Sequence, residues 1–142
     1  MPDRAKFYWL FLSFSGRVDR LVYFLANLLI AVIQLIPVWK ATMAIMPLGP
    51  ETLMNADIEQ IIQMSPDFAF WWSITSFIAF IMLWPYFALG AKRCHDVGWH
   101  GFFAITLAIP LLQLVAFIAL CLIPGNPGPN RYGARQNAPA SS

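Results

Sequence analysis

Four residues with chemically reactive side chains lie close together in the chain: Cys94, His95, Asp96 and His100. Thiolate, imidazole and carboxylate groups are the usual ligands of zinc. However, adjacent residues rarely coordinate one ion together, and the spacing matches no established zinc motif. We therefore predict no metal site and no cofactor. The alternative chemistry, a His95–Asp96 acid–base pair in a membrane enzyme, also needs a nucleophile and a cleft, which the sequence does not indicate.

The elements that must position these residues are strongly apolar. The chain has 142 residues, of which 59% are hydrophobic and 11% are charged. A soluble domain has about 45–50% apolar and about 25% charged residues. A core of this size cannot hide the excess, because roughly a third of the unfolded surface stays exposed. The composition excludes a typical soluble enzyme and a largely disordered chain, and the net charge of +2 does not support nucleic-acid binding.

Three long stretches, residues 21–39, 68–91 and 97–130, contain no Asp, Glu, Lys or Arg. A helix needs about 20 apolar residues to cross a bilayer, and helix is the default because backbone groups in lipid must be satisfied within the segment. We predict an all-α, polytopic membrane protein with one integral membrane domain over residues 1–135. Its three transmembrane helices should lie at about 21–39, 68–90 and 102–123. We expect the last one to be kinked at Pro110; a re-entrant hairpin is the alternative.

Basic residues flank these stretches unevenly. They precede the first stretch or follow the second, as Arg4, Lys6, Arg17, Arg20, Lys92 and Arg93. The connection between those two stretches holds Lys40 against the acidic residues Glu51, Asp57, Glu59 and Asp67. Short loops rich in Lys and Arg stay on the cytoplasmic side. The N-terminus and the loop after residue 90 are therefore predicted inside, and the acidic connection outside.

Shorter segments are expected around the spans. Residues 5–14 are aromatic and flanked by basic residues, which favours a helix lying in the membrane interface. Asp19 is placed to cap the first span. A surface helix is predicted over residues 51–64, starting after Pro50, and the sequence at Ser65 and Pro66 should end it and start the second span. Residues 136–142 are predicted to form a disordered tail.

Polar residues inside the spans leave a second function open. Asn27 and Gln34 are seven residues apart and share one helix face, and Gln113 lies in the third stretch. Such side chains commonly form hydrogen bonds between helices. In an oligomer they could instead line a channel or transport path. No ionisable residue lies deep in a span, which argues against coupled transport by a monomer.

Three polar segments at the span boundaries form an ordered set. They are F-S-G-R-V-D-R-L-V-Y-F (residues 14–24), A-K-R-C-H-D-V-G-W-H-G-F-F (91–103) and P-G-N-P-G-P-N-R-Y-G (124–133). Together they resemble the small bacterial membrane proteins grouped as domain of unknown function 805. The resemblance covers most of the chain. It implies a multi-pass protein of the bacterial inner (cytoplasmic) membrane whose biochemical activity is not established.

The motif residues are the candidate contact site for lipid or a partner. They are Gly16, Arg17, Arg20, Tyr23, Lys92, Arg93, His95, Asp96, Gly98, Asn130, Arg131, Tyr132 and Gly133. Basic side chains at the inner boundary can extend to lipid phosphates. A compatible alternative is that Asp19 and Asp96 pair with the arginines and hold the two inner loops together. Arg131 and Tyr132 are expected to act as an interface anchor.

These observations predict a non-enzymatic inner-membrane protein that acts through contacts at the cytoplasmic boundary. Membrane lipids are the expected partners, together with a second copy or another membrane protein, and no nucleic acid. The alternatives are a subunit of an oligomeric channel or transporter, and a membrane enzyme using His95 and Asp96.

Overall fold

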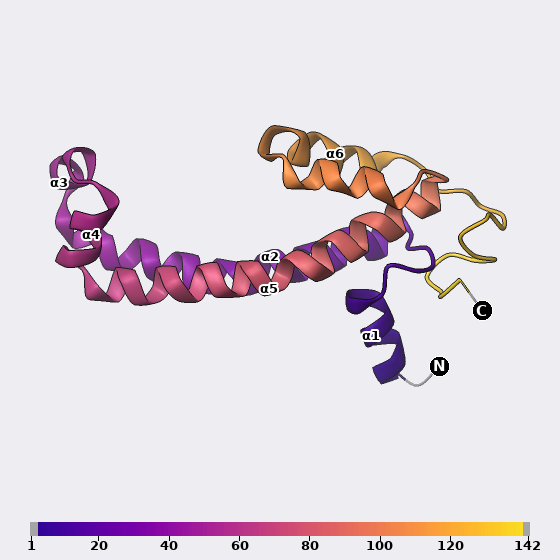
Figure 1. Ribbon diagram of the computed structural model, residues 1–142, viewed down its shortest axis with the longest axis horizontal. Helices are drawn as coiled ribbons and strands as arrows, with labels where there is room; N and C mark the ends of the chain where they lie inside the picture. Colours follow the sequence, from indigo (N-terminus) through magenta and orange to yellow (C-terminus); the bar gives the residue numbers. More distant parts are fainter. Residues whose placement is uncertain (1–2, 141–142) are drawn as a thin grey trace. The chain divides into compact units, whose positions relative to one another are not determined.

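The computed structural model describes residues 3–140, in which helices are the only regular elements and no strand is present. The predicted all-α class is confirmed. The elements, in chain order, are α1 (Asp3–Leu12), α2 (Arg20–Ile45), η1 (Met46–Leu48), α3 (Pro50–Asn55), α4 (Ile58–Met64), α5 (Pro66–Val97), η2 (Gly101–Ala108) and α6 (Pro110–Leu122) (Figure 1). η1 and η2 are 3₁₀-helices.

The chain divides into two compact units. The first, here called the terminal unit, contains the residues up to Leu29 and those from Leu83 onward. The second, the middle unit, is Ile30–Met82. All three sequence motifs belong to the terminal unit.

Two helices are long and apolar enough to cross a membrane, α2 with its η1 extension and α5. In each, only 28% of the most apolar window is buried. The core helix of a soluble protein is mostly buried, and these two helices differ from it in exposing most of their apolar residues. Both run past their predicted ends at residues 39 and 90.

The end of α5 differs from the prediction, which placed a loop after residue 90. The helix continues to Val97 and stops where Gly98 adopts a left-handed backbone with φ of 88°. The amide of Gly98 donates to the carbonyl of His95 at 3.1 Å, and that of Trp99 to Cys94 at 2.8 Å, which is the usual glycine-terminated helix end. The charged residues from Lys92 to Asp96 therefore lie on the last turns of a helix, with Arg93 and Asp96 on one face.

The third apolar stretch forms a hairpin and not a kinked single helix. Its two arms, η2 and α6, pack against each other and are drawn in orange in Figure 1. One end of the hairpin, Gly101, lies against His95, and the other end, Ile123, accepts a hydrogen bond from Arg93. Both ends therefore meet the last turns of α5. The single helix kinked at Pro110 is not formed, and the three-span topology is not confirmed; the stretch has the hairpin shape of the alternative.

The reversal follows from Pro110. Ile109, the residue before it, is extended, with φ −98° and ψ 116°, as proline requires of its predecessor. Pro110 is then the first residue of α6, where its missing N–H costs nothing. The 13 residues of α6 reach about 20 Å at 1.5 Å per residue, short of a hydrocarbon core of about 30 Å.

Small residues let the hairpin approach α5. Ala91, Ala104 and Leu107 form a buried cluster against which Tyr86 packs. A β-carbon added at Gly90 would collide with a methyl group of Leu107. The absence of a side chain at Gly90 therefore sets how closely η2 can lie on α5.

In the middle unit, short helices connect the end of α2 to the start of α5. The predicted single helix over residues 51–64 is instead two, because Asp57 caps a new helix. Its carboxylate accepts from the amide of Gln60 at 2.9 Å, and the Gln60 side chain accepts from the Asp57 amide at 3.3 Å. The predicted start of α5 is confirmed: Pro66 is its first residue, and the Ser65 hydroxyl accepts from the amide of Phe68 at 3.3 Å.

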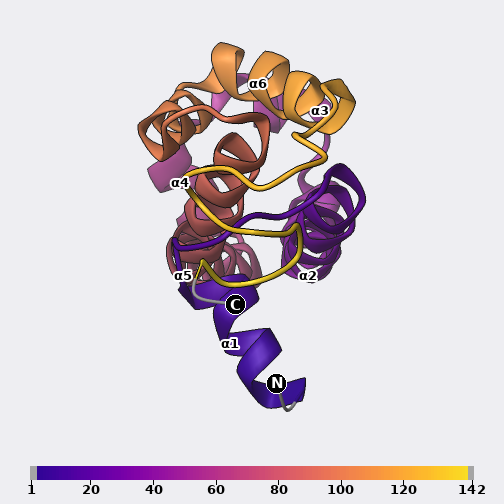
Figure 2. The same cartoon turned by 90° about the vertical axis from the view of Figure 1, so that its right-hand side faces the viewer.

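The end of the chain packs against other segments of the terminal unit. This corrects the prediction of a disordered tail for residues 136–140. The amide of Asn137 donates to the carbonyl of Arg17 at 2.8 Å, and Ala138 is buried. Figure 2 shows this yellow segment lying across the ends of α2 and α5. The sequence could not predict this, because the tail has no pattern of its own and is held by residues far away in the chain. Residues 141–142 lie outside the described residues.

Replacing Gly90 with leucine should push η2 away from α5. We expect Gly90→Leu to lower the free energy of unfolding by about 1–3 kcal/mol, the usual cost of overfilling a packed site. Thermal unfolding of the purified protein measures the change. Ala108→Leu, which adds the same side chain at an exposed position of η2, is the control and should unfold like the wild type. Equal unfolding temperatures for the two variants would contradict the packing described here.

Candidate functional site

Four charged side chains at the end of the terminal unit are completely buried: Arg17, Lys92, Arg93 and Asp96. We call them the charged cluster. They come from two motifs far apart in the sequence, the segment before α2 and the last turns of α5. Buried charges are tolerated only when they are paired and hydrogen-bonded, so the partners of each one define what the site does.

The Asp96 carboxylate is the centre of the cluster and accepts four hydrogen bonds. Its Oδ1 accepts from Nε of Arg17 at 3.1 Å and from Nη2 of Arg17 at 3.0 Å. Its Oδ2 accepts from Nη1 of Arg93 and from Nε2 of Gln136 at 2.9 Å. The two lone-pair directions of each oxygen are thus used by this chain. No acceptor capacity is left for a ligand or a proton in transit.

Arg17 makes five hydrogen bonds, which matches the five N–H groups of a guanidinium. Besides the two to Asp96, it donates to the backbone carbonyls of Gly128 at 2.7 Å, Gly133 at 3.2 Å and Asn126. These carbonyls belong to the third motif, whose glycines and prolines cannot form a helix and therefore leave backbone acceptors open. The loop of the third motif therefore wraps around the Arg17 side chain.

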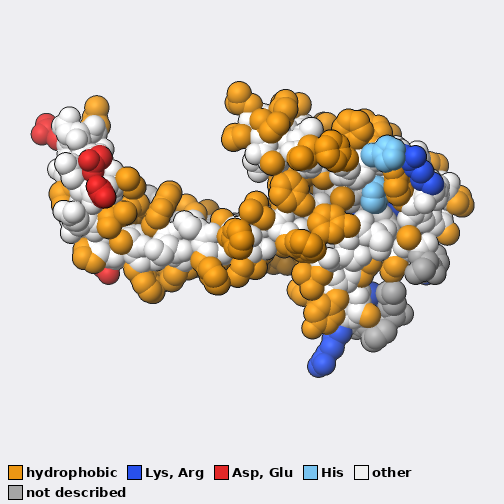
Figure 3. Space-filling view, viewed as in Figure 1, with side chains coloured by type: hydrophobic (Ala, Val, Ile, Leu, Met, Phe, Trp, Pro, Cys, Tyr) orange, Lys and Arg blue, Asp and Glu red, His pale blue; other side chains and the backbone are white. Residues whose placement is uncertain are grey.

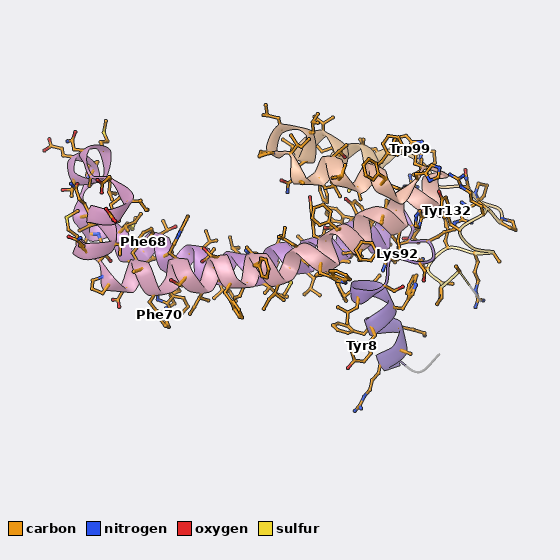
Figure 4. The ribbon with its side chains drawn as sticks, viewed as in Figure 1. Tyr8, Phe68, Phe70, Lys92, Trp99 and Tyr132 are labelled. Atoms are coloured by element: carbon orange, nitrogen blue, oxygen red, sulfur yellow. The ribbon has the colours of Figure 1, made fainter. Side chains whose placement is uncertain are left out.

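Lys92 and Arg93 each donate hydrogen bonds to the last carbonyls of a different helix. Nζ of Lys92 donates to the carbonyls of Trp9, at 2.8 Å, and Leu10 in the last turn of α1. Arg93 donates to the carbonyls of Leu120, at 2.8 Å, and Ile123 at the end of α6. The last carbonyls of a helix lack internal partners and carry partial negative charge, so a cation there is favourable. Figure 4 labels Lys92 on α5, beside the top of α1.

A second group of motif residues lies at the outer edge of the cluster. The rings of His95 and Tyr132 are stacked, with centroids 3.9 Å apart and an interplanar angle of 11°. The Arg131 guanidinium lies 4.7 Å from the Tyr132 ring centroid, and the Tyr132 hydroxyl is 3.4 Å from Nδ1 of His100. Arg131 and His100 are exposed. This edge is where motif side chains reach the surface.

The structure does not form the His95–Asp96 pair of the enzyme alternative. Nδ1 of His95 is 3.2 Å from the carbonyl of Gly16, while the Asp96 carboxylate is held by the arginines and Gln136. Among the described residues, no group of three or more His, Cys, Asp and Glu side chains is arranged to hold a metal ion.

The predicted contacts of the basic residues are therefore corrected in part. Arg17, Lys92 and Arg93 were expected at lipid phosphates, but all three are buried against protein groups. The alternative role of Asp96, pairing with arginines to join two segments, is what the structure shows. Asp19 instead caps α2 through the amide of Val22 at 2.7 Å and accepts from Asn137 at 2.7 Å. Its predicted capping role is confirmed.

The remaining motif residues support the loops or the bundle. Gly16 has a left-handed φ of 91°, and an added β-carbon would collide with the carbonyl of Ala138. Asn130 donates to the carbonyl of His95 at 2.9 Å and pairs with Gly133 in a tight turn. Tyr23 is buried, with its ring 5.7 Å from that of Phe117. Arg20, at the start of α2, is exposed.

Sequence reasoning missed two groups at the centre of the site. Gln136 fell in the predicted tail, although it binds Asp96. Gly125, in the third motif, was not singled out, although a β-carbon there would collide with the Asp96 carboxylate. The density of glycine in the third motif is a signal of such close approach, but the sequence does not say what approaches.

A protein-family model described as "Protein of unknown function (DUF805)" matches residues 11–134. The chain belongs to the DUF805 family. The matched region contains the three motifs and the whole charged cluster, whereas Gln136 and Asn137 lie just beyond it. No curated protein and no solved structure matches the chain. The family match therefore supplies no function, and the role of the motif residues has to be inferred from their geometry.

Removing the charge of Asp96 should destabilise the whole terminal unit. We expect Asp96→Asn to lower the free energy of unfolding by about 3–5 kcal/mol, because two buried guanidiniums lose their counter-charge. The unfolding temperature of the purified protein and its abundance in cells are the measurements. Asp67→Asn, at the exposed first turn of the same helix, is the control and should cost less than about 1 kcal/mol. A wild-type unfolding temperature for Asp96→Asn would refute the central role of the carboxylate.

Replacing Lys92 with methionine should release α1 while leaving the arginine–aspartate contacts in place. Without the ammonium group, two helix-end carbonyls lose a charged donor. We expect amide hydrogen exchange in residues 3–12 to become about 10- to 100-fold faster, as for the loss of about 1–3 kcal/mol. Arg135→Met, at an exposed arginine, is the control. Unchanged exchange in α1 would show that other contacts hold it.

Proposed function

We propose that this chain is a non-enzymatic, multi-pass protein of the bacterial inner membrane that acts through lipid or protein contacts at the cytoplasmic boundary. The observation that carries the proposal is the internal use of the motif charges. Arg17, Lys92, Arg93 and Asp96 are buried and bonded to protein groups. They therefore build a scaffold, and the surface left for function is apolar with an exposed basic edge.

The exposed apolar surface supports a membrane environment. Large side chains such as Leu35, Phe80 and Leu111 are 63%, 74% and 87% exposed. Figure 3 shows hydrophobic side chains over much of the visible face. Soluble monomers rarely expose contiguous apolar patches larger than a few hundred Å². Lipid is the solvent that such a surface fits, with α2 and α5 as the two crossings and the η2–α6 hairpin entering from one side.

The charge distribution supports an N-terminus in the cytoplasm. The terminal unit holds every Lys and Arg of the chain except Lys40, whereas the middle unit holds the four acidic residues Glu51, Asp57, Glu59 and Asp67. In Figure 3 the acidic side chains gather at α3 and α4. The hairpin returns Arg131 and Arg135 to the side of Lys92, so all basic segments obey the positive-inside rule. A single third crossing would place these two arginines outside.

One observation favours a second candidate, a channel subunit. Tyr23 Oη, Asn27 Oδ1 and Gln34 Oε1, all on α2, are buried without a hydrogen-bond partner among the described residues. Polar atoms of this kind need water or a neighbouring molecule. In an oligomer they could face a polar path. The third residue suggested for such a path, Gln113, donates to the Tyr86 hydroxyl at 3.1 Å. Ion flux from liposomes that contain the purified protein would favour this candidate.

Reporter fusions test the proposed topology. A green fluorescent protein attached after Ser142 should fluoresce, and alkaline phosphatase at the same site should be inactive, because both termini are cytoplasmic. Alkaline phosphatase inserted after Ala56, between α3 and α4, should be active. The same reporters placed after Gly98 should report the same side as those after Ser142. An active phosphatase at Ser142 together with fluorescence at Gly98 would mean a full third crossing and would overturn the topology.

A further inference from the structure

A groove of about 620 Å³ lies between the second half of α5 and η2. Leu83, Phe87 and His95 line it from α5, Phe102 and Ile105 from η2, and Phe14 closes it from the segment after α1. His95 is the one ionisable side chain among its lining residues. Its volume and its apolar walls with a single polar group are typical of a ligand site.

The groove has the length of one leaflet. From Leu83 to His95 the helix advances about 18 Å at 1.5 Å per residue. Half of a hydrocarbon core of about 30 Å is about 15 Å, the depth reached by the lipid chains of one leaflet. The polar end of the groove, at His95, coincides with the end of α5, where the charged cluster and the proposed membrane boundary lie.

The polar end is cationic at its surface. His95 stacks on Tyr132, which in turn contacts Arg131 and approaches His100. The nearby Asp96 carboxylate is buried and fully used by the arginines and Gln136. The exposed positive charge of Arg131 therefore lies at this edge, and the Asp96 carboxylate does not reach it. In Figure 3 the pale-blue histidines lie beside blue basic side chains.

The missing side chain at Gly101 leaves room for the His95 ring at the groove. The carbonyl of Gly16 can only accept, so Nδ1 of His95 carries the proton, and Nε2 is an acceptor. A β-carbon at Gly101 would lie 2.7 Å from Nε2. The glycine thus allows the ring to lie flat between Tyr132 and the mouth of the groove.

We propose that this groove binds one acyl chain of an anionic phospholipid, with the lipid phosphate at Arg131 and His100. The inference rests on the proposed membrane location and deepens the proposed lipid contact into one defined site. The charge complementarity between the phosphate and this edge, directly above an apolar groove of one-leaflet length, identifies the occupant. The site was not visible in the sequence, because its walls come from three segments.

The groove walls disfavour the other occupants. A peptide strand would bring backbone N–H and C=O groups against apolar walls that offer no partners, which is costly, whereas an acyl chain brings none. A second copy of this chain would bring the same basic edge against Arg131. A zwitterionic lipid brings the same phosphate together with a cation, which the positive charge of Arg131 repels, so it should bind more weakly than an anionic lipid.

Lipid titration followed by native mass spectrometry tests the site. The full-length protein in detergent is titrated with dioleoyl phosphatidylglycerol and, separately, with dioleoyl phosphatidylcholine. We expect tighter binding of the anionic lipid, and a loss of about fivefold in its affinity for Arg131→Gln, the contribution of one basic group near a phosphate. His100→Gln should weaken the same lipid. Arg135→Gln, at an exposed arginine four residues further on, should bind like the wild type.

Filling the groove tests the acyl-chain part of the proposal. Ile105→Trp should lower the affinity for both lipids, and Leu83→Trp is the second variant if the first fails to fold. Leu111→Trp, at an exposed position of α6 outside the groove, is the control. Equal affinities for the two lipids, an equal loss in Arg135→Gln, or unchanged binding in the folded groove variants would each overturn the site. So would a protein dimer that the groove variants abolish.

The two proposals fail separately. A chain that carbonate washing leaves in the membrane but that shows no lipid preference refutes the groove and leaves the membrane proposal standing. A chain that is released from the membrane fraction refutes both.

Discussion

The structure of the terminal unit depends on one buried carboxylate. Asp96 is completely buried, and a carboxylate in that position needs opposite charge and hydrogen bonds. They come from Arg17 before α2, from Arg93 on α5 and from Gln136 near the end of the chain. Arg17 uses its remaining N–H groups on the loop after α6. None of these segments can leave without stranding a buried charge, so they are held in place together.

The same cluster fixes the ends of two helices. Lys92 and Arg93 are neighbours on α5, about 100° apart around the helix axis, and each therefore faces a different neighbour. One completes the end of α1 and the other the end of α6. Arg93 thereby fixes the returning end of the hairpin beside its starting point. This contact, together with the extended residue before Pro110, brings both ends of the hairpin to the last turns of α5.

The motifs of the DUF805 family divide into an internal and an outward set. The internal set is used in contacts within the chain. Removing one partner of such a buried pair is costly, because it leaves the other charge buried and unpaired. The outward set, which includes Arg20, His100 and Arg131, faces the proposed boundary beside exposed apolar side chains. Among the motif charges, only that set is accessible to a lipid headgroup or a partner, whereas the sequence suggested that all of them were.

The sequence by itself determined the features that depend on neighbouring residues. The uncharged stretches predicted α2 and α5, Pro66 marked the start of α5, and Asp19 marked the start of α2, because apolar runs, proline and capping side chains act within a few residues. The length of α5 and the path of residues 97–130 depend instead on tertiary contacts. Charged residues end an apolar run, but the helix continues through them when their side chains are buried against partners elsewhere in the chain. Arg17 and Asp96, which pair, lie 79 positions apart. A pairing over that distance leaves no local pattern, so the site, the hairpin and the ordered residues 136–140 had to be read from the fold.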